Sequence, residues 1–333
     1  MKVIQSIPFS LKLIASIVLL FSTCYVAILF GAANTSIQDI WNVITATGEG
    51  EYYTVLRDIR FPRVIAAFLV GSALAVSGAI MQGVTRNPLA DPGLLGITAG
   101  ANAALALSMA FFPAVSYMLI VVGCFIGAGI GMTIVYGIGA STKGGLSPLK
   151  LVLAGAAVSA FLQAVADGVG ILFHVSKDVS MWTAGGLIGT TWQALLVAPI
   201  ILMGLIASIA GSRQLTILSL NEDVAVGLGQ KTARIKTILM AIVVILAGAA
   251  VALVGNLAFV GLMVPHIVRA LVGQDYRYII PMSIIIGGLF MIIADLVGRV
   301  LNAPFETPVV AIIAIIGLPF FLLLVRKGGR QFG

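Results

Sequence analysis

Charged residues are scarce in this sequence. Only 9% of the 333 residues are charged, whereas 60% are hydrophobic. A water-soluble domain of this length needs far more charge to cover its surface, so the composition excludes an ordinary soluble protein and indicates an integral membrane protein. The net charge of +7 does not indicate nucleic-acid binding, because the basic residues are scattered between apolar runs.

Cysteine and histidine are equally scarce. Cys24 and Cys124 lie inside apolar runs, where cysteine packs as a small hydrophobic residue, and they predict no disulfide framework. His174 and His266 have no cysteine or carboxylate at the spacing of metal ligands. The sequence also shows no serine or cysteine nucleophile motif. We therefore expect no metal site and no enzymatic chemistry in this chain.

A usable nucleotide-binding loop is missing too. Residues 229–232 (GQKT) end like a phosphate-binding loop, but that loop needs glycine directly before the lysine, whereas Gln230 stands there, and no strand precedes it. If ATP drives this protein, a separate chain binds the ATP and its Mg²⁺, and no cofactor is expected here.

Ten segments are apolar enough to be membrane helices, since about 20 apolar residues cross a bilayer. They are 11–31, 63–83, 93–112, 114–139, 149–172, 192–211, 234–254, 257–271, 279–298 and 308–325. The eighth is the weakest, because Pro265, His266 and Arg269 interrupt it. No long polar region separates the segments. The sequence therefore predicts an all-α polytopic membrane protein with one transmembrane domain over residues 1–333.

The first segment is longer than the core of a signal peptide, and no small-residue cleavage site follows it, so we expect it to be retained. With the N-terminus in the cytoplasm, ten crossings return the C-terminus there, and most Lys and Arg residues lie inside, as the positive-inside rule requires. The exceptions on the outer side are Arg57, Arg60, Arg63, Lys177 and Arg299.

The fifth segment carries a polar stripe. Ser159, Gln163 and Asp167 recur every four residues and therefore share one helix face. Polar groups facing lipid are costly, so this face is expected to line a water-filled pathway or to form hydrogen bonds between helices. Asp167 is also the single carboxylate in the middle of a segment, which gives thin support for a proton relay.

Two patterns of small residues suggest internal organisation. Residues 71–78 (GSALAVSG) resemble residues 248–255 (GAAVALVG), on segments that run in opposite directions, which suggests either an inverted repeat or a chance likeness of small-residue helices. Gly123, Gly127 and Gly131 form a ladder that predicts a packing face between helices.

Several stretches together resemble one family, the permeases of the vitamin B12 and iron-siderophore ATP-binding-cassette (ABC) importers. They are 59–63 (IRFPR), 71–78 with Gln82, 87–96 (NPLADPGLLG), 220–229 (LNEDVAVGLG), 259–269 (FVGLMVPHIVR) and 294–299 (ADLVGR), in the order typical of the family. The resemblance implies a ten-helix subunit of type II importer architecture. It also implies a second permease copy or a paralogous permease, a cytoplasmic ABC ATPase dimer and an external substrate-binding protein.

The resemblance implies roles for particular residues. Arg60, Arg63 and Arg299 match positions that meet acidic residues of the binding protein, which would explain their exceptional place; the alternative is a solvated arginine loop with Asp58 and Glu306 nearby.

Residues 220–229 resemble the segment that couples the permease to the ATPase, and the coupling residues implied are Leu220, Asn221, Glu222, Asp223, Ala225, Gly227 and Gly229. Acidic residues in the first turn of a helix favour helix formation there, and an ordinary charged loop is the alternative. Ser147 and Pro148 match the inner gate region, although the sequence departs from the family around them.

The expected function is that of a permease subunit which moves a ferric siderophore across the bacterial cytoplasmic membrane by alternating access. Haem and cobalamin are the alternative substrates within the family, and a stand-alone secondary transporter or channel is the alternative of another class. The chelate, and the choice between a homodimeric and a heterodimeric pore, stay open at this point.

Overall fold

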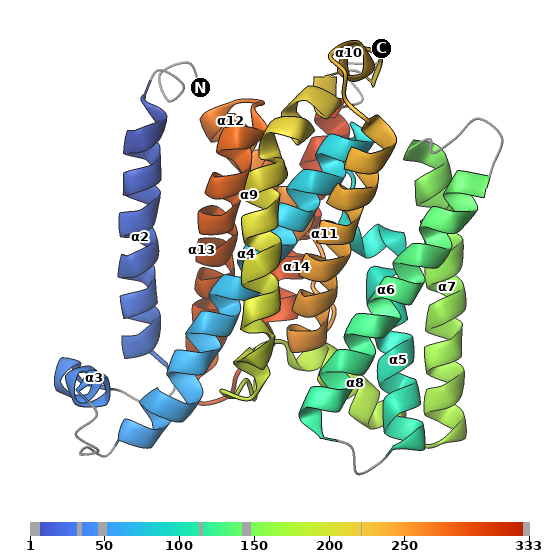
Figure 1. The fold of residues 1–333 in the computed structure, drawn as a ribbon. Coiled ribbons are helices and arrows are strands. Elements are labelled where there is room, and N and C mark those ends of the chain that lie inside the picture. The colour runs from blue at the N-terminus through green and yellow to red at the C-terminus, as the bar shows by residue number, and fades with distance from the viewer. Residues whose placement is uncertain are drawn as a thin grey trace.

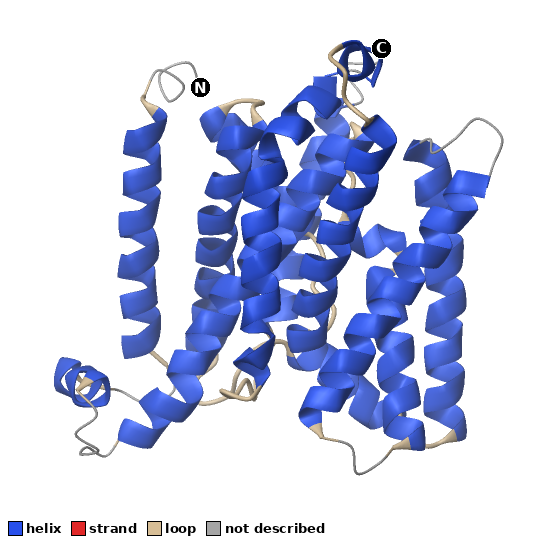
Figure 2. Ribbon diagram, viewed as in Figure 1, coloured by secondary structure: helices blue, strands red, loops and turns tan. Residues whose placement is uncertain are grey.

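A computed structural model describes residues 7–31, 35–45, 52–112, 116–141, 148–220 and 222–328. Every regular element in these ranges is a helix (Figure 2). The apolar helices stand roughly side by side and form one helical body (Figure 1).

Ten apolar helices in the described ranges form this body, seven of them long enough to cross a membrane and three shorter. In chain order they are α2 (Phe9–Leu29), α4 (Phe61–Thr85), α5 (Ile97–Phe111), α6 (Tyr117–Ser141), α7 (Pro148–Leu172), α9 (Ala198–Leu220), α11 (Thr232–Val254), α12 (Val260–Val272), α13 (Tyr276–Val300) and α14 (Val309–Gly328). Each overlaps one of the ten predicted segments, so the predicted ten-helix architecture is confirmed.

Short elements lie at the two ends of the body. A π-helical turn (Val55–Arg60) precedes α4, and 3-10 turns (Pro92–Leu95 and Ala194–Val197) precede α5 and α9. Helices α3 (Ile37–Ile44) and α8 (Ser176–Gly185) lie at one end, which we call the α3 end. Helix α10 (Glu222–Gly227) lies at the opposite end, called the α10 end, together with the start of α2 (Figure 1).

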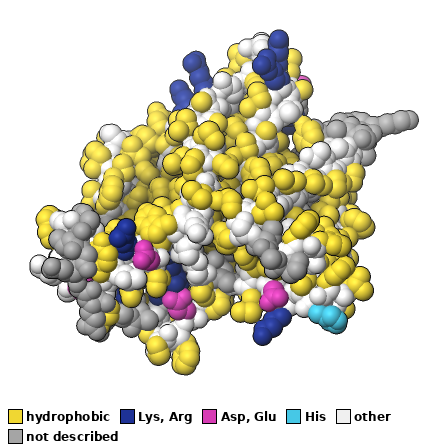
Figure 3. Space-filling model, turned by 60° about the horizontal axis from the view of Figure 1, so that its bottom comes forward, with side chains coloured by type: hydrophobic (Ala, Val, Ile, Leu, Met, Phe, Trp, Pro, Cys, Tyr) yellow, Lys and Arg dark blue, Asp and Glu magenta, His cyan; other side chains and the backbone are white. Residues whose placement is uncertain are grey.

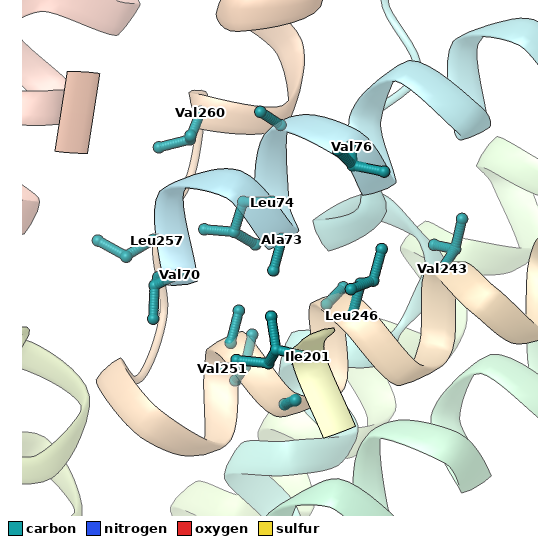
Figure 4. Close-up of a cluster of buried hydrophobic side chains, with 14 of the residues drawn as sticks. Val70, Ala73, Leu74, Val76, Ile201, Val243, Leu246, Val251, Leu257 and Val260 are labelled. Atoms are coloured by element: carbon teal, nitrogen blue, oxygen red, sulfur yellow. The ribbon is translucent and has the colours of Figure 1, made fainter. Parts of the chain in front are cut away.

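Helix α4 is the centre of the body and is buried along nearly its whole length. Its small residues let other backbones approach closely: a side chain at Gly71 would collide with the carbonyl of Gly287 on α13, and one at Gly78 with that of Gly261 on α12. Figure 4 shows the hydrophobic core beside it, in which side chains of α4, α9 and α11 meet, among them Val70 and Leu246.

Helices α5 and α12 are shorter than the sequence predicts, because each begins only after an irregular stretch. The residue before each helix has a left-handed backbone: Gly96 before α5, with φ 75°, and Phe259 before α12, with φ 68°. Each follows a long small-residue helix, α4 or α11, and these two run in opposite directions (Figure 1). This arrangement favours the inverted repeat over a chance likeness.

The glycine ladder of α6 packs against α5. Side chains at Gly127 and Gly131 would collide with the backbone carbonyls of Gly100 and Gly96. The ladder is therefore the packing face that the sequence predicts.

Candidate functional site

The α3 end holds a buried ionic cluster, which we define as Arg60, Arg63, Asp295, Arg299 and Glu306. At its centre the Arg63 guanidinium donates from Nε to Oδ1 of Asp295 at 2.9 Å, and its Nη1 binds both oxygens of Glu306 at 2.9 Å. Oδ2 of Asp295 forms an ion pair with Nε of Arg299 at 3.0 Å. Asp295 thus bridges two arginines, and its side chain is only 1% exposed.

Arg60 and Arg299 also donate hydrogen bonds to backbone carbonyls at the end of α2. Arg60 donates from Nη1 to the carbonyl oxygens of Ile28 and Leu29, at 2.7 and 2.8 Å. Arg299 donates to those of Ala27 and Phe30, at 3.0 and 3.1 Å. The last carbonyls of a helix lack partners within the helix and carry its negative dipole end, so two cations there satisfy and stabilise them. The cluster therefore fastens α2 to α4 and α13.

These positions differ from what an exposed docking rim requires. Arg60, Arg63 and Arg299 are 4%, 6% and 3% exposed, and they bind groups within the same chain. The solvated-loop alternative is wrong for the same reason, although it named Glu306 correctly as a neighbour. That these arginines meet a binding protein stays a prediction, and such contact would require the cluster to open.

The surface of the α3 end is largely apolar. Figure 3 brings this end forward and shows scattered charged side chains, with basic and acidic ones as neighbours, in a mostly hydrophobic face. Arg57 and Asp58 are exposed there, and the carbonyl oxygen of Arg57 accepts a hydrogen bond from Nε1 of Trp192.

The polar stripe of α7 lies on the outside of this single chain. Gln163 and Asp167 are exposed, and Nε2 of Gln163 donates to Oδ1 of Asp167 at 2.9 Å, within the same helix. Oγ of Ser159 is buried and has no hydrogen-bond partner in the described part of the chain. The Gln163–Asp167 contact is thus not the bond between helices that the packing alternative requires. A carboxylate on a membrane-spanning helix needs water or a partner chain beside it.

The predicted coupling segment forms α10 and the turn after it. Ala225 is fully buried, whereas Leu220, Val226 and Leu228 are 68%, 57% and 65% exposed. Leu220 ends α9, and Val226 and Leu228 lie in α10 and the turn after it. That this segment contacts an ATPase stays a prediction. Glu222 begins α10, Asp223 is exposed, and Asn221 lies outside the described residues.

Glycine ends this helix. Gly229 has φ 79°, the NH of Gln230 donates to the carbonyl of Ala225, and that of Gly229 donates to the carbonyl of Val226. This Schellman arrangement requires a left-handed residue, which glycine adopts without strain. Nothing lies within 4 Å of a side chain added at Gly227. The space over Gly227 is therefore open to a partner.

The inner gate prediction falls largely outside the described part of the chain. Ser147 is not described, and Pro148 is the first residue of α7.

A group of hydrogen bonds at the α10 end, not expected from the sequence, joins Thr216 of α9 to Asp275 and Tyr276 at the start of α13; we call it the Thr216–Asp275 latch. Oγ1 of Thr216, on α9, donates to Oδ1 of Asp275 at 3.0 Å and accepts from the backbone NH of Tyr276 at 3.0 Å. Asp275 also caps the first turn of α13 through the NH of Arg277, and the Arg277 guanidinium is the main cause that lowers the pKa of the Asp275 carboxyl. Aspartate before an apolar segment is a capping signal that could have revealed half of this latch.

A second polar group ties α4 to α12. Nε2 of Gln82 donates to the carbonyl oxygen of Gly261 at 3.1 Å, and Oε1 of Gln82 accepts from Arg269. Arg269, which interrupts the eighth apolar segment, therefore has a hydrogen-bond acceptor inside the protein.

Comparison with known proteins adds an independent line of evidence. Residues 17–327 match the FecCD transport family. The chain is 46% identical, over 96% of its own length and 83% of the relative, to the iron(3+)-hydroxamate import system permease protein FhuB of Bacillus subtilis (strain 168). It is 41% identical, over 92% of its length and 93% of the relative, to the iron-uptake system permease protein FeuB of the same organism.

The fold has a matching solved structure. A metal-chelate type ABC transporter in an inward-facing conformation superimposes with a TM-score of 0.83 at 26% identity, over 96% of this chain and all of that one.

Proposed function

Because the chain belongs to the FecCD transport family, we propose that it is the permease subunit of an ABC importer that carries ferric siderophores across the bacterial cytoplasmic membrane. The single observation behind this proposal is the family match over residues 17–327, nearly the whole chain. The polytopic fold supports it, since ten apolar helices in the described ranges supply the membrane-spanning body that a permease needs.

The energy for transport enters through a partner. The chain contributes α10 as a contact surface, with exposed apolar side chains and the open approach over Gly227. A cytoplasmic ATPase dimer binds ATP and Mg²⁺ and moves this surface, so the α10 end faces the cytoplasm and both termini lie there. The permease itself performs no covalent chemistry.

The pathway forms between two permeases, identical or paralogous. The exposed Gln163–Asp167 pair of α7 faces water or a second subunit in this arrangement, which removes the cost of a polar face against lipid. Alternating access then opens the shared space to either side of the membrane.

The external binding protein docks at the α3 end. In the resting permease the ionic cluster holds α2 against α4 and α13 and gives this end a fixed shape. When the cluster opens, acidic groups of the binding protein compete with Asp295 and Glu306 for Arg63 and Arg299.

Within the iron chelates we favour a ferric hydroxamate, because the iron-hydroxamate permease FhuB is the relative with 46% identity. The test reconstitutes the permease with its ATPase and binding protein in vesicles and measures ATP-dependent uptake of ⁵⁵Fe-hydroxamate, haem and cobalamin. Uptake of the hydroxamate alone is expected. Preferential uptake of haem or cobalamin would change the substrate, and ATP-independent uptake by the permease alone would overturn the importer assignment in favour of a secondary transporter or channel.

A further inference from the structure

An apolar groove runs along the outside of the protein between α6 and α11. Its central part has a volume of about 560 Å³ and is lined by Phe125, Ile130, Val244 and Ile245, among others. A second part of about 280 Å³ continues toward the α10 end past Tyr136 and Thr237, and both parts share Thr133, Ala241 and Val244. The two helices spread apart toward that end (Figure 1).

The lining of the groove is mainly apolar, and its polar side chains are those of Thr133, Tyr136 and Thr237. The hydroxyl of Thr133 donates to the carbonyl of Gly129 on its own helix at 2.7 Å, and that of Thr237 donates to the carbonyl of Ala233 at 3.0 Å. Because both hydroxyls already donate within their own helices, neither has a proton left to donate to a ligand. The lining spans about 18 Å from Phe125 to Gly137 at 1.5 Å per residue, about three-fifths of a hydrocarbon core about 30 Å thick.

Basic residues stand where the groove reaches the membrane surface. Arg234 is exposed and lies one turn before Thr237, so it extends the lining stripe of Thr237, Ala241 and Val244 on the same face of α11. Lys231, also exposed, lies at the start of the same helix. Basic residues beside a gap between membrane helices attract anionic lipid headgroups.

From this combination we propose that the groove binds one anionic phospholipid of the leaflet at the α10 end. One acyl chain lies between α6 and α11, and the phosphate lies beside Arg234 and Lys231. We choose a lipid because the apolar lining lies along membrane-spanning helices, where an acyl chain fits, and because the exposed cations Arg234 and Lys231 stand at its end, where an anionic headgroup would lie. The site is independent of the transported substrate.

The test is native mass spectrometry of the full permease with its copurified partners, from micelles supplied with equal amounts of phosphatidylglycerol and phosphatidylcholine. Wild type is expected to retain one phosphatidylglycerol in preference. A Cβ at position 129 would lie 3.8 Å from Cγ1 of Val244 on the facing wall, so the large side chain of Gly129→Trp should fill the groove. This variant should no longer retain phosphatidylglycerol. Ala241→Phe, on the opposite wall, provides a second filling variant if the first does not fold.

Arg234→Gln should weaken phosphatidylglycerol binding about fivefold and leave phosphatidylcholine unchanged, as expected for one basic residue at an anionic surface. The matched controls, Arg213→Gln at the same end and Leu202→Trp on the exposed face of α9, should bind as wild type does. Equal retention in the filled variants, or no preference for phosphatidylglycerol, would overturn the proposal. Loss of a subunit from the complex, with lipid unchanged, would show that the groove is a protein interface.

Discussion

Replacing Asp295 with asparagine tests whether the outer arginines are structural in this chain or free to bind a partner. The substitution preserves size but removes the charge that bridges Arg63 and Arg299. Removing one partner of a buried ion pair costs about 3–5 kcal/mol, since the remaining charge stays buried without compensation. Both arginines keep other partners, Arg63 the carboxylate of Glu306 and Arg299 two carbonyl groups at the end of α2, so the free energy of unfolding should fall by about 3 kcal/mol, the lower end of that range.

Glu306 provides the matched comparison. It contacts the same guanidinium at 2.9 Å, but its side chain is 30% exposed, and Arg63 keeps Asp295 when Glu306 is changed. Glu306→Gln should therefore cost about 1 kcal/mol or less, as partly solvated pairs do. Asp178→Asn, at an exposed carboxylate of the same end, should be neutral.

The assay is reversible unfolding of the purified permease in mixed detergent micelles, followed by loss of helical circular dichroism. If the arginines are instead exposed in the resting protein, Asp295→Asn and Glu306→Gln will have equal effects within about 0.5 kcal/mol. That result would refute the buried cluster and restore a preformed docking rim.

Three further predictions concern the other sites. Gly227→Leu should fold normally, because the space around Gly227 is open, yet it should lose ATP-driven uptake. Gly229→Leu should in addition lower the free energy of unfolding by about 1 kcal/mol or more, because Gly229 has a positive φ. Normal uptake by Gly227→Leu would exclude α10 as the contact. Asp167→Cys, in a cysteine-free background, should react with a small water-soluble thiol reagent, and protection in every state of the assembled transporter would favour packing over a pathway. Arg277 lowers the pKa of Asp275, so the contribution of Asp275 to stability should be complete above its unfolded pKa of about 3.9 and should disappear as the pH falls through the lower folded pKa. Urea unfolding curves should show this loss of stability at acid pH in wild type and not in Asp275→Asn.

Sequence predicted the helices well because the membrane imposes a length and a composition that are visible locally. It predicted the starts of α5 and α12 less well, since these depend on backbone geometry. A left-handed residue is readily expected at Gly96, but a phenylalanine rarely adopts that conformation, so nothing local to Phe259 reveals it. The same limit explains why the apolar segments at 93–112 and 257–271 extend beyond the actual helix starts.

The exceptional arginines were identified from sequence, but their environment was not. Charge bias predicts that Arg63 lies at the outer side, yet its partners Asp295 and Glu306 are more than 230 residues away along the chain. The i,i+4 spacing of Asp295 and Arg299 predicts one ion pair of the cluster, and only the packing of α4 against α13 adds the others. The α2 carbonyls that hold Arg60 are backbone groups, which carry no sequence signal at all.

Helix α13 connects the two ends that the proposed mechanism must coordinate. Its first turn is held by the Thr216–Asp275 latch to α9, the helix that leads into α10, and its last turns carry Asp295 and Arg299. A helix of 25 residues spans about 37 Å, and beyond Pro281 near its start no other proline interrupts its hydrogen bonds. Under the proposed function, a displacement of α10 would reach the ionic cluster as movement of this one helix, and a binding protein that opened the cluster would release the same helix from α2. In that mechanism each end would bias the other, which is what coupling between docking and ATP hydrolysis requires.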